Sequence, residues 1–157
     1  MTGIRYSTRR SAIERSNNPA NPNKNVCAYA VAHALFVQDE VRYLHTWGDM
    51  MRAVRKLWSM RSVASAVNAT KRDTSVGAVR AGLMKHAEQH SDVASYVVRV
   101  DGHVLLIGRD GKTMVDTDPR KRDRRKVLNV YGVYVKPSTR ETLLSKMRAA
   151  LRSVQHD

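Results

Sequence analysis

The chain has 157 residues, of which 42% are hydrophobic, which is enough for one domain with a single core. Its 28 Lys and Arg outnumber its 14 Asp and Glu, and the resulting net charge of +14 favours acidic partners. No apolar run approaches the roughly 18 residues that cross a bilayer, and no apolar block follows the first basic residues, so we expect a cytoplasmic protein without a secretory signal. The single cysteine, Cys27, excludes an internal disulfide and any CxxC motif.

The first helix is expected directly after a polar arm. Residues 1–24 contain two prolines among asparagines, which predicts an arm and loop, and a single domain is expected over residues 25–157. Asn25 is a suitable N-cap. The alanine-rich run from Val26 to Gln38 predicts a helix with Cys27 in its first turn.

Two more helices are predicted before the strands. Apolar residues three and four positions apart predict an amphipathic helix over Thr46–Met60. Thr74 is expected to cap a further helix from Ser75 to about Glu88. Between these two helices, residues 63–73 have no clear pattern.

Short β-branched and aromatic runs, separated by turn formers, predict an antiparallel meander of about four strands. The runs are Tyr96–Val100, His103–Gly108, Thr113–Thr117 and Val127–Val135. A capping box within residues 137–141, followed by an apolar stripe at helical spacing, predicts a closing helix. Helices first, then an antiparallel sheet and one last helix, are typical of an α+β fold.

Cys27 is the first candidate for chemistry. A lone cysteine is more often a buried core residue than a nucleophile. At a helix amino-terminus, however, the thiol meets the positive end of the helix dipole, which favours the reactive thiolate. Backbone N–H groups in the same turn can stabilise an oxyanion.

His103 is the second candidate, because it opens a strand directly after the Asp101-Gly102 turn. A lone histidine on a strand is more often structural than catalytic. If Asp110-Gly111 forms a two-residue turn, counting outward places His103 opposite Asp118, with Asp116 one diagonal step away on the same face. Either carboxylate could orient the imidazole, and the alternative is an ordinary strand end before an Asp-Pro turn.

The order of a cysteine at a helix start, a histidine at a strand start and an aspartate on the next strand resembles the papain-like cysteine peptidase fold. Relatives of that fold include bacteriocin-processing peptidases and transglutaminase-like enzymes. The segments Tyr96–Ile107, Asp110-Gly111, Val115–Asp118 and Val130–Tyr134 are similar to small papain-like proteins encoded by bacteriophages. The resemblance covers residues 21–135, is sharpest from residue 96 onward, and implies a protein made in a phage-infected cell.

The resemblance implies a Cys-His-Asp site. Cys27 is then the nucleophile, and His103 is the general base and acid. The hairpin count and the following proline favour Asp118 as the orienting carboxylate, whereas the hydrophobic-Asp-Thr pattern of the phage proteins favours Asp116. Asn21 stands six positions before the cysteine, where family members often have the glutamine of the oxyanion hole.

The implied reaction is acyl transfer on a protein or peptide, which the basic charge would favour as an acidic one. If water resolves the thioester, the enzyme is a peptidase or deamidase, and if an amine does so, it is a transferase. The sequence leaves this choice open.

A basic run interrupts the predicted sheet. Its cations are Arg120, Lys121, Arg122, Arg124, Arg125 and Lys126, and the region of the second helix adds Arg52, Arg55, Lys56 and Arg61. They are either a solvated surface or a sequence-neutral contact to phosphates. The alternative function is therefore a non-catalytic papain-like scaffold that binds nucleic acid or a host protein.

His86 and His90 lie one helical turn apart, a spacing that can hold zinc. No further ligand completes a familiar motif. We expect a solvated helix face at these residues, and neither a metal nor a cofactor in the protein.

Overall fold

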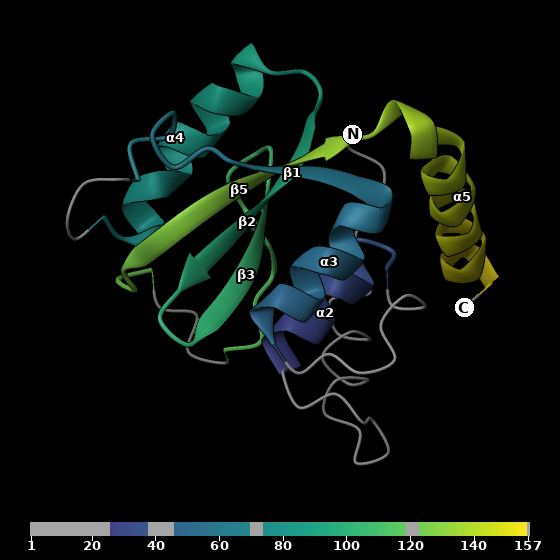
Figure 1. Ribbon diagram of the computed structural model, residues 1–157, viewed down its shortest axis with the longest axis horizontal. Helices are drawn as coiled ribbons and strands as arrows, with labels where there is room; N and C mark the ends of the chain where they lie inside the picture. Colours follow the sequence, from purple (N-terminus) through teal and green to yellow (C-terminus); the bar gives the residue numbers. More distant parts are fainter. Residues whose placement is uncertain (1–25, 38–45, 70–73, 119–122, 157) are drawn as a thin grey trace.

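A computed structural model describes residues 26–37, 46–69, 74–118 and 123–156 (Figure 1). The predicted arm over residues 1–24, the N-cap Asn25 and part of the basic run lie outside this range. In chain order the elements are α2 (Val26–Ala34), α3 (Trp47–Leu57), β1 (Trp58–Ser62), α4 (Val76–Gln89), β2 (Val93–Val100), β3 (His103–Gly108), β4 (Thr113–Val115), β5 (Val127–Val135), the 3-10 turn η2 (Pro137–Thr139) and α5 (Arg140–His156). Helices packed with one antiparallel sheet confirm the predicted α+β class.

The sheet has five strands in the order β1-β5-β2-β3-β4, and every neighbouring pair is antiparallel. The predicted meander of about four strands is therefore wrong in two respects. β5 does not follow β4 in space but returns to pair with β2, and β1 adds an edge strand beside β5. The connection from β4 to β5 thus crosses from one edge of the sheet to its interior.

β1 lies where the sequence predicts the end of a helix. The helix α3 ends at Leu57, and Trp58 and Met60 are buried in a strand with exposed residues at 61 and 62. Trp58 continues the helical spacing from Val54, whereas Trp58 and Met60 together have strand spacing, so tertiary contacts decide between the two. The indole Nε1 of Trp58 donates to the carbonyl of Leu35 at 2.8 Å, and the backbone of Trp58 pairs with Val135.

The helix boundaries differ from the predicted ones by a few residues. α2 ends at Ala34 instead of Gln38, because Phe36 adopts a left-handed backbone with φ of 64°. α4 is capped by Ser75, not Thr74, through a 3.0 Å hydrogen bond from the N–H of Ala78. These shifts leave Cys27 in the first turn of its helix.

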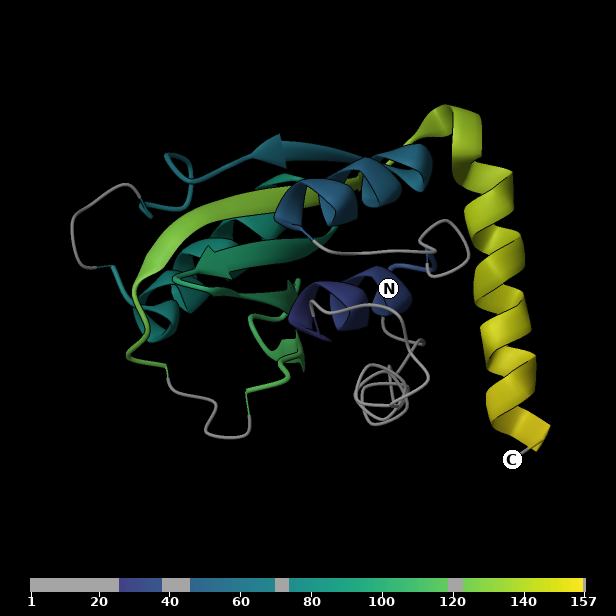
Figure 2. The ribbon, with the colours of Figure 1, turned by 60° about the horizontal axis from the view of Figure 1, so that its bottom comes forward.

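Helices cover both faces of the sheet (Figures 1 and 2). Side chains of β2 and β3 alternate between two core clusters, as the strand period requires. Val97, Val104 and Leu106 pack with α2 and α3, whereas Val98, Leu105 and Ile107 pack with α4. Cys27 packs against the cluster on the α2 and α3 side.

The closing helix α5 lies beside the α2 and α3 end of the molecule (Figure 2). Leu143 is buried, but Leu151 is 41% exposed, so the predicted apolar stripe is only partly covered. The segment of the predicted capping box begins instead with the 3-10 turn η2, which has no side-chain cap and ends at Thr139. The hydroxyl of Thr139 donates to the carbonyl of Leu57 at 2.6 Å and so fastens the start of α5 to the end of α3.

Candidate active site

Cys27 lies in the first turn of α2, which packs against β3. The helix contains buried alanines, and such small side chains let it approach the sheet closely. The cysteine is half-buried at the edge of the core cluster that α2 and α3 share. The sulfur is therefore neither sealed inside the core nor fully exposed.

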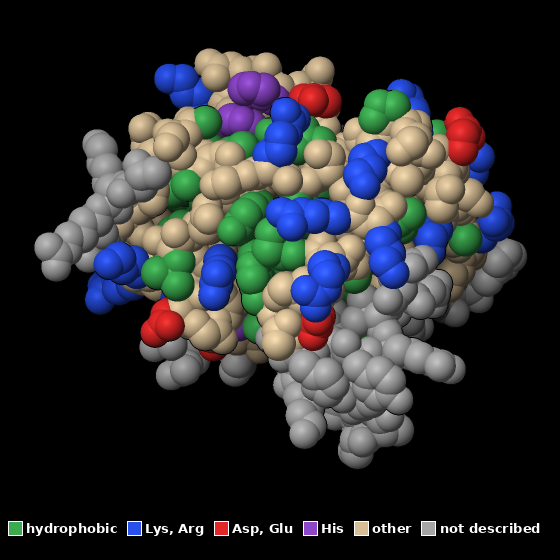
Figure 3. Space-filling model, in the orientation of Figure 1, with side chains coloured by type: hydrophobic (Ala, Val, Ile, Leu, Met, Phe, Trp, Pro, Cys, Tyr) green, Lys and Arg blue, Asp and Glu red, His purple; other side chains and the backbone are tan. Residues whose placement is uncertain are grey.

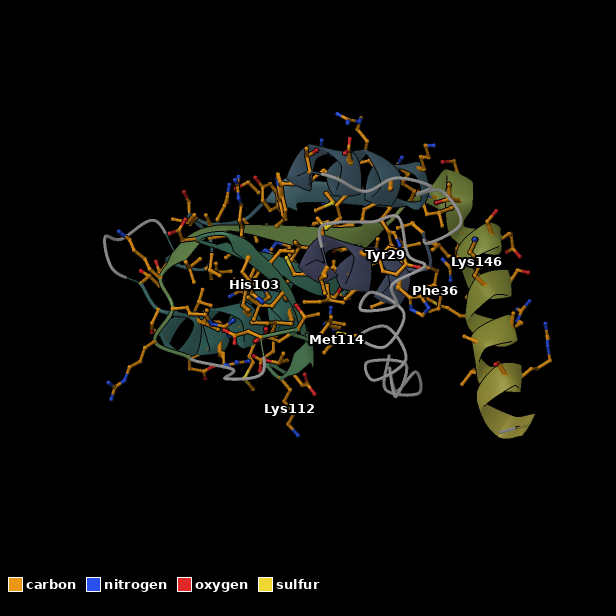
Figure 4. The ribbon with its side chains drawn as sticks, turned by 90° about the horizontal axis from the view of Figure 1, so that it is seen from below. Tyr29, Phe36, His103, Lys112, Met114 and Lys146 are labelled. Atoms are coloured by element: carbon orange, nitrogen blue, oxygen red, sulfur yellow. The ribbon has the colours of Figure 1, made fainter. Side chains whose placement is uncertain are left out.

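His103 is the first residue of β3, next to α2 (Figure 4). It pairs with Val100 across a two-residue turn in which Gly102 has a φ of 63°, a backbone conformation that favours glycine. The imidazole is 17% exposed, and its Nε2 lies 2.8 Å from Oδ1 of Asp116. Its other hydrogen bond joins it to the thiol of Cys27. Because Nε2 is taken by Asp116, Nδ1 is the nitrogen left for the thiol.

The structure thus brings together Cys27, His103 and Asp116, which the sequence separates by up to 89 positions. The three side chains come from the start of α2, the start of β3 and the residue after β4. A hydrogen-bonded chain runs from sulfur to imidazole to carboxylate.

Asp118 does not occupy the place that the hairpin count predicts for it. The loop between β3 and β4 is longer than a two-residue turn, because the N–H of Gly108 bonds to the carbonyl of Lys112 at 2.9 Å. The register shift that follows offsets the added residue, so Leu106 pairs with Val115 as the count predicts, but β4 ends at Val115 and the ladder does not reach Asp118. The N–H of Asp118 donates to Oδ1 of Asp116 at 3.0 Å, which turns the chain before Asp118 could face His103. The partner of the imidazole is therefore Asp116.

Arg125 is an unexpected member of the site. Its Nη2 lies 2.7 Å from Oδ2 of Asp116, its Nη1 lies 3.4 Å from Oδ1, and Nη1 also lies 3.6 Å from Oδ2 of Asp118. The side chain is only 11% exposed. The prediction that Arg125 forms part of an outward phosphate-binding run is therefore wrong. The sequence gives no signal that separates this arginine from its basic neighbours.

His103 and Asp116 each stabilise the charged form of the other. The hydrogen bond to Asp116 and then that to Cys27 raise the pKa of His103 to about 9, although burial acts in the opposite direction. Burial alone would raise the pKa of Asp116, but hydrogen bonds from His103, Arg125 and the backbone of Asp118 outweigh it and hold that pKa well below its usual range. At neutral pH the site therefore contains an imidazolium and a carboxylate.

The remaining basic candidates do not form one site. Asn21, Arg120, Lys121 and Arg122 lie outside the described residues. Arg124 and Lys126 are exposed, as are Arg52, Arg55 and Lys56 on α3. Lysine and arginine side chains are spread over the face shown in Figure 3, with apolar side chains between them.

The predicted solvated helix face is wrong for His86, which is only 5% exposed, whereas His90 is exposed. The Nδ1 of His86 lies 2.7 Å from the hydroxyl of Tyr96, and its ring stacks on that of His90 with centroids 4.1 Å apart. Burial, and then the neighbouring His90, lower the pKa of His86. Within the described ranges, no group of three or more His, Cys, Asp and Glu could hold a metal ion.

A thiol, an imidazole and a carboxylate linked by hydrogen bonds can generate a nucleophile and move its proton. None of the described helices has the length and apolar character needed to cross a membrane. Comparisons with known protein families, curated proteins and solved structures found no match to this chain. The functional argument therefore rests on the geometry of the site.

Proposed function

We propose that the protein is a cysteine-dependent acyl-transfer enzyme with a papain-like arrangement, and most simply a peptidase. The observation that carries this proposal is the hydrogen-bonded series of Cys27, His103 and Asp116. A buried histidine with a purely structural role would need only one polar partner. Here each side of the imidazole meets a group with a distinct role in thiol chemistry.

The mechanism follows from these roles. The reacting form of the pair has the proton on His103 and a thiolate at Cys27. The sulfur forms a bond to the acyl carbon, and the carbonyl π electrons move to the oxygen, which the backbone N–H groups of the first turn of α2 stabilise. When the C–N bond breaks, the leaving amine takes the proton of His103, and a thioester remains on Cys27.

The second half of the reaction restores the enzyme. His103 accepts a proton from the incoming nucleophile, whose oxygen or nitrogen forms a bond to the thioester carbon as the C–S bond breaks. Water gives a peptidase, or a deamidase where the acyl group is a side-chain amide, and an amine gives a transglutaminase-like transferase. Asp116 keeps the ring oriented and favours its charged form throughout.

Alkylation with iodoacetamide tests this proposal directly, because Cys27 is the single cysteine and every cysteine adduct reports on it. We expect rapid alkylation at about pH 6, well below the ordinary thiol pKa of about 8.5. The His103→Ala variant should react at least about tenfold more slowly at that pH, and the Asp118→Asn variant serves as the matched control. A wild-type rate equal to that of a free thiol, or a rate unchanged in His103→Ala, would refute the proposal.

A second candidate is nucleic-acid binding without turnover, which the net charge of +14 and the exposed cations of α3 favour. Such binding would weaken steeply with salt and would not depend on sequence. Titration of a labelled DNA duplex at low and at physiological ionic strength checks it. Lack of binding at low ionic strength removes this candidate.

A further inference from the structure

Arg99 and two aromatic residues form a cluster on the sheet face that α2 and α3 cover. The guanidinium of Arg99 lies over the ring of Trp47 at 5.2 Å from the centroid. Trp47 in turn packs against Tyr131, with ring centroids 5.6 Å apart and planes tilted by 44°. The three residues come from β2, the start of α3 and β5.

This cluster adjoins the candidate active site. Arg99 pairs across β2 and β3 with Val104, the residue directly after His103. Residues paired in an antiparallel ladder have Cα atoms about 5 Å apart. Cys27, Trp47 and Tyr131 also pack against the same core cluster. Trp47, which holds Arg99, thus packs against the same core cluster as the sulfur-bearing residue.

Hydrogen bonds of Asn129 hold the aromatic part of the cluster in place. The amide of Asn129 donates to the hydroxyl of Tyr131 at 3.0 Å, and the hydroxyl of Ser62 bonds to Oδ1 of Asn129 at 2.9 Å. These contacts fix the tyrosine that supports Trp47. The indole ring then holds the guanidinium through a cation–π contact. The positive charge is thus oriented before any ligand arrives.

The guanidinium of Arg99 is available for a ligand. The residue is exposed, and within the described part of the chain no carboxylate forms an ion pair with it, including that of Asp101 two positions further on. Arg61, which lies over the ring of Tyr134 in a similar way, differs because Asp92 lies 3.9 Å from it. Arg99 therefore presents an oriented charge that none of the described carboxylates neutralises.

We propose that Arg99, supported by Trp47 and Tyr131, binds an acidic side chain of the peptide or protein that Cys27 attacks. The inference rests on the proposed function and names its substrate class. A peptide fits better than a nucleic acid, because binding of single strands uses open aromatic faces on which bases stack, and here Arg99 already lies over Trp47. A single carboxylate matches the single guanidinium next to the site.

The test measures how fast electrophilic peptides alkylate Cys27 in the full-length protein. Two peptide series carry Glu, Gln or Lys, one before a carboxy-terminal chloromethyl ketone and the other after an amino-terminal chloroacetyl group. Together they place the variable side chain on either side of the reactive carbon. We expect the Glu peptide to react about five- to tenfold faster than the Lys peptide in at least one series, as an exposed charge pair provides.

Two variants separate Arg99 from the general positive charge. Arg99→Gln should bring the ratio of the Glu to the Lys rate close to one, while the rate with iodoacetamide, which has no side chain to recognise, stays unchanged. Arg55→Gln is the matched control, because Arg55 is an exposed arginine near the other end of α3. It should keep the preference for Glu.

The outcomes distinguish this inference from the proposed function. If iodoacetamide reacts in a His103-dependent manner but Glu and Lys peptides react equally fast, the enzyme proposal stands and the role of Arg99 is wrong. The same holds if the preference survives in Arg99→Gln, or if Arg99→Gln abolishes binding of a DNA duplex instead of the preference for Glu. If Cys27 fails to react with iodoacetamide, the proposed function itself falls.

Discussion

Arg125 and Asp116 form a buried ion pair in which Nη2 of the arginine lies 2.7 Å from the carboxylate oxygen that His103 does not use. The carboxylate is therefore held from two sides by two different cations. Arg125 thus restrains the carboxylate that orients the imidazole. The pair joins the residue after β4 to the residues that lead into β5.

Replacement of Arg125 should destabilise the folded protein. Removing one partner of a buried ion pair costs about 3 to 5 kcal/mol, because a charge remains without compensation. We expect Arg125→Met to lower the free energy of unfolding by about 3 kcal/mol in urea denaturation. Arg124→Met replaces an exposed neighbour and should change it by less than about 0.5 kcal/mol. Equal losses in the two variants would contradict the role assigned to Arg125.

Replacement of Asp116 by Asn should change the titration of His103. The hydrogen bond to this carboxylate is the largest cause that raises the pKa of His103 to about 9. In Asp116→Asn we expect the NMR titration of the imidazole to move down towards its ordinary value of about 6.5. Asp118→Asn should leave it near 9. If only the Asp118 variant lowers it, the hairpin count was correct and Asp118 is the orienting residue.

The raised pKa of His103 also predicts how stability depends on pH. Because the folded-state pKa lies above the unfolded value, the contribution is fully present below about 6.5 and is lost as the pH rises through about 9. The shift corresponds to roughly 3 kcal/mol. Urea denaturation from about pH 6 to about pH 10 should show this loss in the wild type and not in His103→Ala. Parallel curves for the two proteins would contradict the prediction.

A substitution in β1 tests the strand that the sequence pattern did not reveal. Trp58→Phe keeps most of the buried ring but removes the Nε1 hydrogen bond to the carbonyl of Leu35. An unpaired buried acceptor costs about 1 to 3 kcal/mol, and we expect the free energy of unfolding to fall by that amount. Leu128→Ala, at a site 51% exposed, is the control and should have a much smaller effect. Equal stability of Trp58→Phe and the wild type would show that this hydrogen bond does not fix β1.

The sequence predicts those parts of the fold that depend on local pattern. The helix that begins before Cys27 and the hairpin that presents His103 follow from capping residues and turn formers, and both are found. Trp58 could not be assigned in this way, since it fits the helical spacing from Val54 as well as the strand spacing to Met60. Its state depends on Leu35 and Val135, which lie far away in the sequence.

The site residues divide in the same manner. The meeting of Cys27 with His103 follows from the order of elements, but the choice between two aspartates depends on where β4 ends. The added loop residue and the register shift offset each other, so Leu106 pairs with Val115 as the hairpin count predicts, but the ladder ends there and does not reach Asp118. The sequence places Arg125 among basic residues, a pattern typical of a surface. Its side chain is buried because it pairs with Asp116, a contact that no local pattern shows.

Because β5 returns to the interior of the sheet, the anchoring of Asp116 by Arg125 depends on completion of the sheet. The strand forms hydrogen bonds with both β1 and β2, and the connection leading into it carries the arginine that anchors Asp116. A nascent or partly unfolded chain in which β5 has not docked has a thiol and an imidazole but an unanchored carboxylate. On the proposed function, the reactivity of Cys27 therefore reports on whether β5 has joined the sheet.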